Sequence, residues 1–313
     1  MRTTRGFSLV ELLLALVITL IVSAGVFEVA RAAREAAVTE PERSDLQQRL
    51  RVASDAIASD LALAGVSGAG ERVSPLGRTI PAVLPFRAGP VHPDPPGTFK
   101  DDTLSIVYAA ADSSQTTLAE PFTPGSSSVV VNATAGCPRI GPTRDPACGF
   151  AAGMQALIFD DSGAYDQLTI AGVAGSSLAL EHRDRHANRT YPAGSFILQA
   201  RRVTYYVKTA TAQLMRYNGI ESDAPAVDNV VGLRFEYFAS ARGGSGLVAL
   251  SRDEFIDGPW RPDATDPNRY DADLLRIRRV AVHLHLRPGT NLPNLPGREV
   301  RFDVAPRSLA AEP

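Results

Sequence analysis

The longest apolar stretch of the chain lies close to its N-terminus. Residues 12–27 contain no charged side chain, and residues 7–10 extend the stretch to 21 residues with a single carboxylate, Glu11. A helix of this length measures about 31 Å, which matches the roughly 30 Å hydrocarbon core of a bilayer. The pattern predicts a membrane-spanning helix, because a cleaved secretory signal has a shorter apolar region followed by a small-residue cleavage site.

An amphipathic pattern follows this stretch. Residues 31–70 are rich in Ala, Arg, Glu and Gln, which favour helix, so we expect the first helix to continue with one apolar face laid on a sheet. Pro41 should bend this helix or end it near Glu40, because proline lacks a backbone donor. Glycines between residues 65 and 70 should stop it. The apolar positions recur every three or four residues: Leu46, Leu50, Ala53, Ile57, Leu61 and Ala64.

The remainder of the chain is typical of a β-rich domain. Seven prolines between residues 71 and 100 predict a loop. Short β-type runs separated by turn residues then predict antiparallel sheets, and no long helix is expected after residue 70. The clearest runs are residues 103–109, 127–132, 155–159, 167–173, 177–181, 195–199, 202–208, 213–217, 227–238, 274–287 and 300–304.

Composition and charge exclude several classes of protein. The chain has 313 residues, 44% of them hydrophobic and 21% charged, which suits one or two packed cores and excludes a disordered polymer or a polytopic membrane protein. Its 32 basic and 34 acidic residues give no net field toward polyanions, so we expect no nucleic-acid partner. Two cysteines are too few for a disulfide-dense scaffold or a four-cysteine zinc site.

The residues around Glu11 form a specific motif. The sequence MRTTRG followed by FSLVE and an apolar run resembles the class III signal of type IV prepilins and of type II secretion pseudopilins. The resemblance implies that a prepilin peptidase cleaves after Gly6 and that Phe7 is then N-methylated. It also implies that Glu11 meets the Phe7 amine of an adjacent subunit, a charge contact that a low-dielectric setting strengthens.

The same resemblance implies a fold and a cellular place. The fold would be α+β and pilin-like, with a long N-terminal helix packed on an enlarged antiparallel sheet. Residues 1–6 would be a cytoplasmic leader, residues 7–30 the transmembrane and polymerisation helix, residues 31–70 its amphipathic continuation, and residues 71–313 a β-rich domain. The chain would cross the inner membrane once with its bulk in the periplasm, then move to the tip of a filament.

Four β-type segments refine the resemblance toward PilW-type minor pilins and the J-type minor pseudopilin (GspJ). These segments are residues 202–207, 214–217, 227–238 and 275–286. A PilW-type protein would assemble with other minor pilins and the major pilin to start or cap a type IV pilus, and a GspJ-type protein would do so in a secretion pseudopilus. A membrane-anchored β-rich binding module is the alternative outside the family.

The two cysteines predict a covalent link. Cys137 and Cys148 flank ten residues that lack apolar periodicity and include three prolines, so we expect an exposed loop rather than a strand. In an oxidising periplasm a disulfide would hold this loop.

The sequence offers only weak metal ligands and no enzyme motif. Asp160, Asp161 and Asp166 could bind calcium, although the spacing is not that of an EF-hand and a β-turn explains the same residues. His283 and His285 share one face of a predicted strand, and outward-facing strand residues account for them better than a metal site. His182 and His186 lie in a polar loop. Without nucleophile-elbow, zinc-protease or P-loop motifs, we expect neither an enzyme nor a cofactor.

Overall fold

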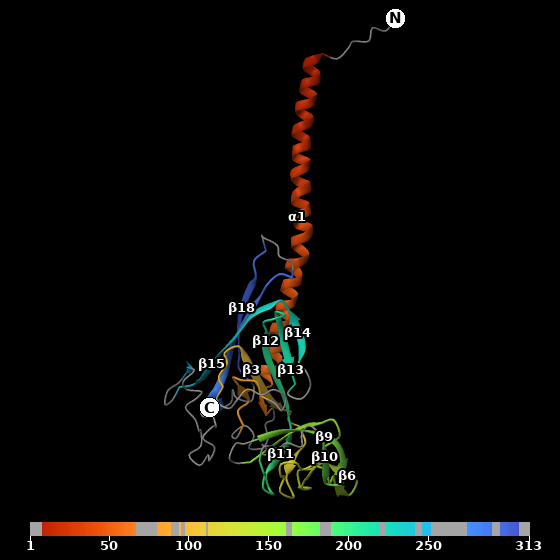
Figure 1. Ribbon diagram of the computed structural model, residues 1–313, viewed down its shortest axis with the longest axis vertical. Coiled ribbons are helices and arrows are strands. Elements are labelled where there is room, and N and C mark those ends of the chain that lie inside the picture. Colours follow the sequence, from red (N-terminus) through yellow and green to blue (C-terminus); the bar gives the residue numbers. More distant parts are fainter. Residues whose placement is uncertain are drawn as a thin grey trace.

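A long helix carries a body of β-sheets on its C-terminal half (Figure 1). The computed structural model describes residues 8–66, 80–88, 94, 98–110, 112–160, 165–181, 189–218, 223–241, 246–251, 274–289 and 295–306. Outside the long helix, these residues form β-strands and a single 3-10 turn, Leu274–Arg276. The predicted α+β, pilin-like fold is confirmed.

The helix α1 (Leu9–Ala62) joins the apolar stretch and the amphipathic pattern into one element. Its first half projects beyond the sheets, and its second half lies against them (Figure 1). The predicted stripe is buried at Leu46, Ala53, Ile57 and Leu61, and Leu50 packs against the same core. The helix stops earlier than residue 70, with Leu63 as its C-cap.

The prediction that α1 could end near Glu40 is wrong. Pro41 lies inside the helix, which continues on both sides of it. Proline removes one helical hydrogen bond, and contacts directly after it keep the helix in place. The Glu42 carboxylate accepts a hydrogen bond from the backbone N–H of Gly289 and pairs with Arg49 at 3.1 Å. Pro41 therefore lies where α1 reaches the body.

Two sheets and the docked half of α1 form what we call the proximal lobe. The first sheet has the order β1-β3-β12-β13-β14, with β2 paired to β3, and the second has the order β16-β15-β17-β18. All pairs are antiparallel except β1 with β3. The strands of the first sheet are β1 (Gly65–Val66), β2 (Val83–Leu84), β3 (Thr103–Ala109), β12 (Arg201–Lys208), β13 (Gln213–Tyr217) and β14 (Ala224–Asp228). Those of the second are β15 (Val230–Ser240), β16 (Leu247–Ala249), β17 (Ile277–Leu286) and β18 (Arg298–Val304).

A third sheet forms the distal lobe, the described residues between 112 and 199. Its strand order is β4-β11-β8-β9-β10-β5, and a separate hairpin, β6-β7, accompanies it. The lobe is inserted between β3 and β12, which pair directly with each other. The strands are β4 (Gln115–Thr117), β5 (Ser128–Val130), β6 (Arg139–Ile140), β7 (Thr143–Arg144), β8 (Gln155–Phe159), β9 (Tyr165–Ala174), β10 (Ser177–Leu180) and β11 (Phe196–Gln199).

The two lobes have separate cores that meet at β8. Leu157 and Phe159 belong to the core that also contains Ile57 of α1. Ala156 and Ile158, which alternate with them, belong to the distal core. Because successive strand residues point to opposite faces, one sheet can complete both cores.

Three predictions about the β-rich part need correction. The run 227–238 is two strands rather than one, because Asn229 adopts a positive φ of 61° and sends β14 and β15 into different sheets. The predicted loop contains a buried segment at residues 80–85, where β2 pairs with β3 because an edge position tolerates the flanking prolines. The run 274–287 begins as a 3-10 turn before β17.

Candidate functional site

The first described residues cap α1 through the Glu11 carboxylate. Ser8 is the N-cap; its hydroxyl accepts from the N–H of Val10, and its own N–H donates to Oε2 of Glu11 at 3.2 Å. Ser and Glu three residues apart satisfy two otherwise unpaired helix donors in this way. The side chain of Glu11 therefore lies at the helix start, turned toward the backbone of Ser8. Gly6 and Phe7, the predicted processing residues, lie outside the described residues.

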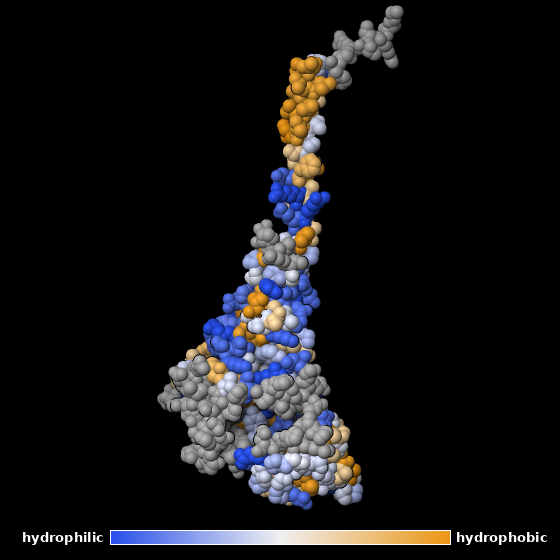
Figure 2. Space-filling view, in the orientation of Figure 1, coloured by the Kyte–Doolittle hydropathy of each residue, from blue (hydrophilic) through white to orange (hydrophobic). Residues whose placement is uncertain are grey.

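The projecting half of α1 exposes its apolar side chains on all sides. Figure 2 shows them as a continuous apolar band that ends where charged residues begin. The helix is long and apolar enough to cross a membrane, and its most apolar window buries nothing within the protein. This surface requires a lipid or protein environment. The exposed residues include Leu9, Leu12, Leu13, Leu16, Ile18, Leu20, Ile21, Val22, Val26 and Phe27.

The comparison with known families bears on this same segment. Residues 1–27 match the prokaryotic N-terminal methylation motif. The N-terminus is of the type IV pilin kind. Together with the exposed apolar helix, the motif indicates a pilin-like or pseudopilin-like protein that is anchored through its N-terminus, processed by a prepilin peptidase and assembled with pilin-type partners. No curated protein matches the chain.

A polar cluster, buried at Asp60 and Tyr205 and partly exposed at Arg216, fixes the docked end of α1. The hydroxyl of Tyr205 donates to Oδ2 of Asp60 at 2.6 Å, and Nε of Arg216 donates to the same oxygen at 3.1 Å. Burial and then the Asp60 charge raise the pKa of the Tyr205 hydroxyl, so it stays a donor. The cluster ties the helix to β12 and β13. The sequence did not predict this cluster, although the carboxylate of Asp60, beside Ile57 and Leu61 on the apolar stripe, was a signal.

A second polar cluster lies on the same sheet. The Arg87 guanidinium pairs with the carboxylate of Asp223 at 2.9 Å and lies over the ring of Tyr217, 4.3 Å from its centroid. The hydroxyl of Tyr206 donates to the same carboxylate. Asp223 and burial raise the pKa of the Tyr206 hydroxyl, with burial the larger cause. These contacts tie residues 80–88 to the strands, and no spacing in the sequence pointed to them.

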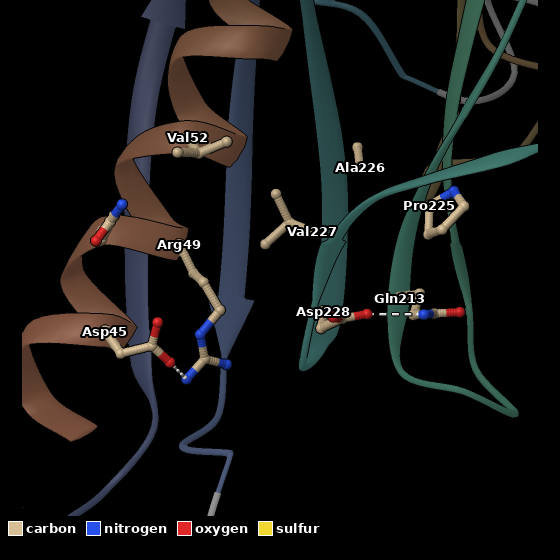
Figure 3. Close-up of a pocket in the computed structure, with 9 residues that line it drawn as sticks. Asp45, Arg49, Val52, Gln213, Pro225, Ala226, Val227 and Asp228 are labelled. Atoms are coloured by element: carbon tan, nitrogen blue, oxygen red, sulfur yellow. Dashed lines mark hydrogen bonds and ion pairs between the residues drawn. The ribbon is translucent and has the colours of Figure 1, made fainter. Parts of the chain in front are cut away.

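A groove of about 370 Å³ separates α1 from the edge strand β14 (Figure 3). Arg49 reaches into it from the helix and pairs with Asp45 at 2.7 Å, while Gln213 bonds Asp228 on the opposite wall. Val52 of α1 and Val227 of β14 also line the groove. The groove has a mixed lining in which Arg49 and Gln213 each bond a carboxylate of their own wall, although Nε of Arg49 has no hydrogen-bond partner among the described residues.

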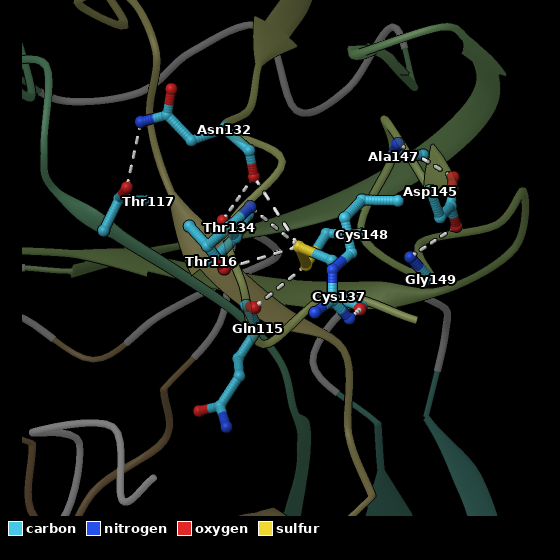
Figure 4. Close-up of a disulfide and its surroundings, with 11 residues drawn as sticks. Gln115, Thr116, Thr117, Asn132, Thr134, Cys137, Asp145, Ala147, Cys148 and Gly149 are labelled. Carbon is cyan, nitrogen blue, oxygen red and sulfur yellow. Dashed lines mark hydrogen bonds between the residues drawn. A yellow bond between two sulfur atoms is a disulfide. The ribbon is translucent and has the colours of Figure 1, made fainter. Parts of the chain in front are cut away.

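The predicted disulfide is present in the structure, and both cysteines are buried. Cys137 and Cys148 are bonded and each is 1% exposed, within the distal core (Figure 4). Residues 138–144 are exposed as predicted, whereas Ala147 is buried with the cysteines, and the segment is not only loop. β6 and β7 form a hairpin there, because Gly141 adopts a positive φ of 63° and permits the tight turn.

The candidate calcium ligands are engaged by other side chains. Asp160 pairs with Arg189 at 3.1 Å, and Asp166 accepts a hydrogen bond from the hydroxyl of Tyr191 at 2.9 Å. Asp161 lies outside the described residues. Within the described part of the chain, no three His, Cys, Asp or Glu side chains are grouped so that they could hold a metal. The predicted β-turn and its weaker calcium alternative are both untested.

The histidines of β17 lie on the outward face, as expected for strand residues. Nε2 of His283 is 3.3 Å from Glu236, and its Nδ1 is 3.9 Å from Glu299. His285 is exposed on the same face. His182 and His186 lie outside the described residues. His283 belongs to a charge cluster with Glu236 and Glu299, and within the described residues this cluster does not form a group of three side chains that could hold a metal.

Proposed function

We propose that the protein is a PilW-like minor pilin, which inserts in the inner membrane and joins other minor pilins and the major pilin to start or cap a type IV pilus. The observation that carries the proposal is the methylation motif on a helix whose first half is apolar and free of contacts with its own body. The other half of that helix is already used as the core of the proximal lobe. In this proposal the first half of α1 serves assembly, and the second half stabilises the fold of the body.

The size and position of the body support a place at the tip. The proximal lobe packs around the last turns of α1, and the distal lobe extends the body further from the helix start (Figure 1). Bulky bodies repeated along a thin fibre would collide, whereas one at its end would not. The body would then lie in the periplasm and later at the filament tip.

The assembly mechanism in this proposal is non-covalent. Exposed apolar side chains of α1 pack with the helices of neighbouring subunits, and the contact between the Phe7 amine and Glu11 sets their register. In the described chain Glu11 accepts from the N–H of Ser8, so its carboxylate already lies at the end of the helix nearest Phe7. Assembly requires only that the carboxylate exchange this local donor for a cationic one, which makes a stronger hydrogen bond.

Processing is the first test. The full chain is co-expressed with a prepilin peptidase, and the N-terminus is read by mass spectrometry. We expect methylated Phe7 at the new terminus, and we expect Gly6→Leu to block cleavage. Gly25→Leu is the matched control, because open space surrounds Gly25 on the same helix. An intact Met1 in membranes that contain active peptidase contradicts the proposal.

Assembly is the second test. Glu11→Ala should still insert and be cleaved, but it should co-purify poorly with partner minor subunits and lower pilus number. Glu28→Ala, an exposed carboxylate further along α1, is the control and should behave as the natural chain. If deletion of the gene for this protein stops secretion but leaves pili intact, the GspJ-like alternative is favoured. A chain that is never cleaved would favour the membrane-anchored binding module.

A further inference from the structure

The hairpin β6-β7 places two like charges opposite each other. Arg139 and Arg144 are direct cross-strand partners, so both side chains leave the same face of the hairpin. Both are exposed. Directly opposed like charges destabilise an antiparallel pair, and a two-stranded hairpin is marginal by itself. The arrangement therefore weakens the hairpin in which it occurs.

Neighbouring groups do not neutralise this pair. Neither arginine forms an ion pair within the described residues, and Nη1 of Arg144 donates only to the neutral carbonyl of Cys137, at 3.0 Å. The adjacent carboxylate is used elsewhere: Asp145 accepts from the backbone N–H groups of Ala147 and Gly149. The hairpin thus carries two arginines at paired positions on one face, and no carboxylate among the described residues pairs with either.

The base of the hairpin holds it in place despite the repulsion. The disulfide joins its two ends, and the backbone N–H of Asp145 bonds the carbonyl of Pro138 at 2.8 Å. The face opposite the arginines carries Ile140, which is 61% exposed. A rigid, exposed tip with arginine on one face and an aliphatic side chain on the other loses little entropy on binding. Arginine is also enriched where interfaces gain most of their energy.

We propose that this hairpin, residues 139–144, inserts into a groove of a partner protein that has carboxylates on one wall and an apolar opposite wall. The carboxylates would pair with Arg139 and Arg144, and the apolar wall would cover Ile140. A linear polyanion would contact only the arginine face, which offers two cations on a chain of net charge −2. The hairpin lies at the end of the molecule opposite the start of α1 (Figure 1). The partner is therefore distinct from the subunits that pack along the helix.

The experiment uses the full chain in detergent and a random peptide library displayed on phage. We expect selection to enrich peptides that combine Asp or Glu with an apolar residue. Arg139→Glu should lower the affinity of the chain for the selected peptides about tenfold or more, which is the range expected for a lost charge-assisted hydrogen bond. The same variant should raise the thermal midpoint of the distal lobe, since it creates an opposite-charge pair with Arg144. Arg201→Gln, an exposed arginine of β12, is the control and should change neither quantity.

The opposing outcomes are distinct. Equal peptide binding by Arg139→Glu, in a folded chain with its disulfide intact, overturns the proposal. So does binding of heparin or of phosphatidylglycerol vesicles without any selection of acidic peptides. Concentration-dependent self-association that Arg139→Glu abolishes would instead assign the hairpin to a second copy of this chain. Leader cleavage and pilus assembly do not depend on this test, so its failure leaves the proposed function unaffected.

Discussion

The two lobes are held together in different ways. The proximal lobe has the larger core, and the buried stripe of α1 is its centre, so burial of a single helix supports two sheets. The distal lobe has a smaller core of short strands, and its least regular segment is closed by a disulfide. Apolar area is enough for the first, whereas the second adds a covalent constraint, as small β-rich units do.

The position of the distal lobe explains how one chain can contain two lobes that are stabilised differently. It begins after β3 and ends before β12, and these two strands pair as they would across a short hairpin. A large insertion at such a point adds little loop-closure entropy to the proximal fold. The lobe that anchors the helix and the lobe that carries the hairpin can therefore change independently, apart from β8 and β11, whose residues belong to both cores.

The largest expected effect tests the dependence of the proximal lobe on α1. Ile57→Ala should cost about 2–5 kcal/mol of its free energy of unfolding, because Ile57 is fully buried beneath the sheet. Leu16→Ala removes the same kind of side chain from the projecting half and should leave the body unchanged. Urea unfolding followed by circular dichroism measures both. An equal loss in the two variants would contradict the division of α1 into two halves.

The disulfide should matter almost as much, but only in the distal lobe. Cys137→Ser should cost about 3 kcal/mol of distal-lobe stability, since it removes the constraint on the unfolded loop. Hydrogen exchange resolves the two lobes, and protection of β12 and β13 should stay unchanged. The double variant Cys137→Ser/Cys148→Ser controls for a free thiol. Two labelled thiols in the folded natural protein, alkylated without reductant, would show that the bridge does not form.

Sequence patterns predicted those parts of this fold that repeat with a period. The spacing of Leu46, Ala53 and Ile57 identified the buried face of α1, and alternation identified most strands. The methylation motif indicated the processed terminus because FSLVE is a fixed local pattern. The insertion between β3 and β12 was missed, because strand pairing at long range leaves no mark in local spacing.

Single-residue conformations and side-chain clusters also could not be predicted from the sequence. Asn229 divides one apparent strand into two by a positive φ, which few residues other than glycine adopt. The cluster of Asp60, Tyr205 and Arg216 joins residues far apart in the chain, so only the folded structure brings them together. The hairpin within the cysteine interval was missed because its strands are only two residues long.

A smaller effect tests the polar attachment of α1. Asp60→Asn should cost about 1–3 kcal/mol, because it weakens two hydrogen bonds to a buried charged acceptor. The raised pKa of the folded Tyr205 hydroxyl also predicts a pH effect. The contribution of the protonated Tyr205 hydroxyl to the free energy of unfolding is complete below the unfolded pKa of about 10. This contribution is lost as the pH rises above that value toward the folded pKa. Tyr205→Phe should flatten that alkaline decline in chemical unfolding, and an unchanged slope would contradict the assignment.

The smallest expected effect tests whether the two cores unfold separately. Ile106 of β3 and Ile158 of β8 are both fully buried, the first in the proximal core and the second in the distal core. Ile→Val at either position should cost about 0.5–1.5 kcal/mol, so the substitutions are matched in chemistry and size.

Each valine variant should lower hydrogen-exchange protection in its own lobe and leave the other lobe nearly unchanged, because the two side chains are in separate cores. The double variant should then show additive losses, as distant sites do. If Ile158→Val lowers protection of β12 and β13 as much as that of β9 and β10, the lobes unfold as one unit. In that case the contact of Leu157 and Phe159 with the proximal core, rather than the disulfide, determines the stability of the distal lobe.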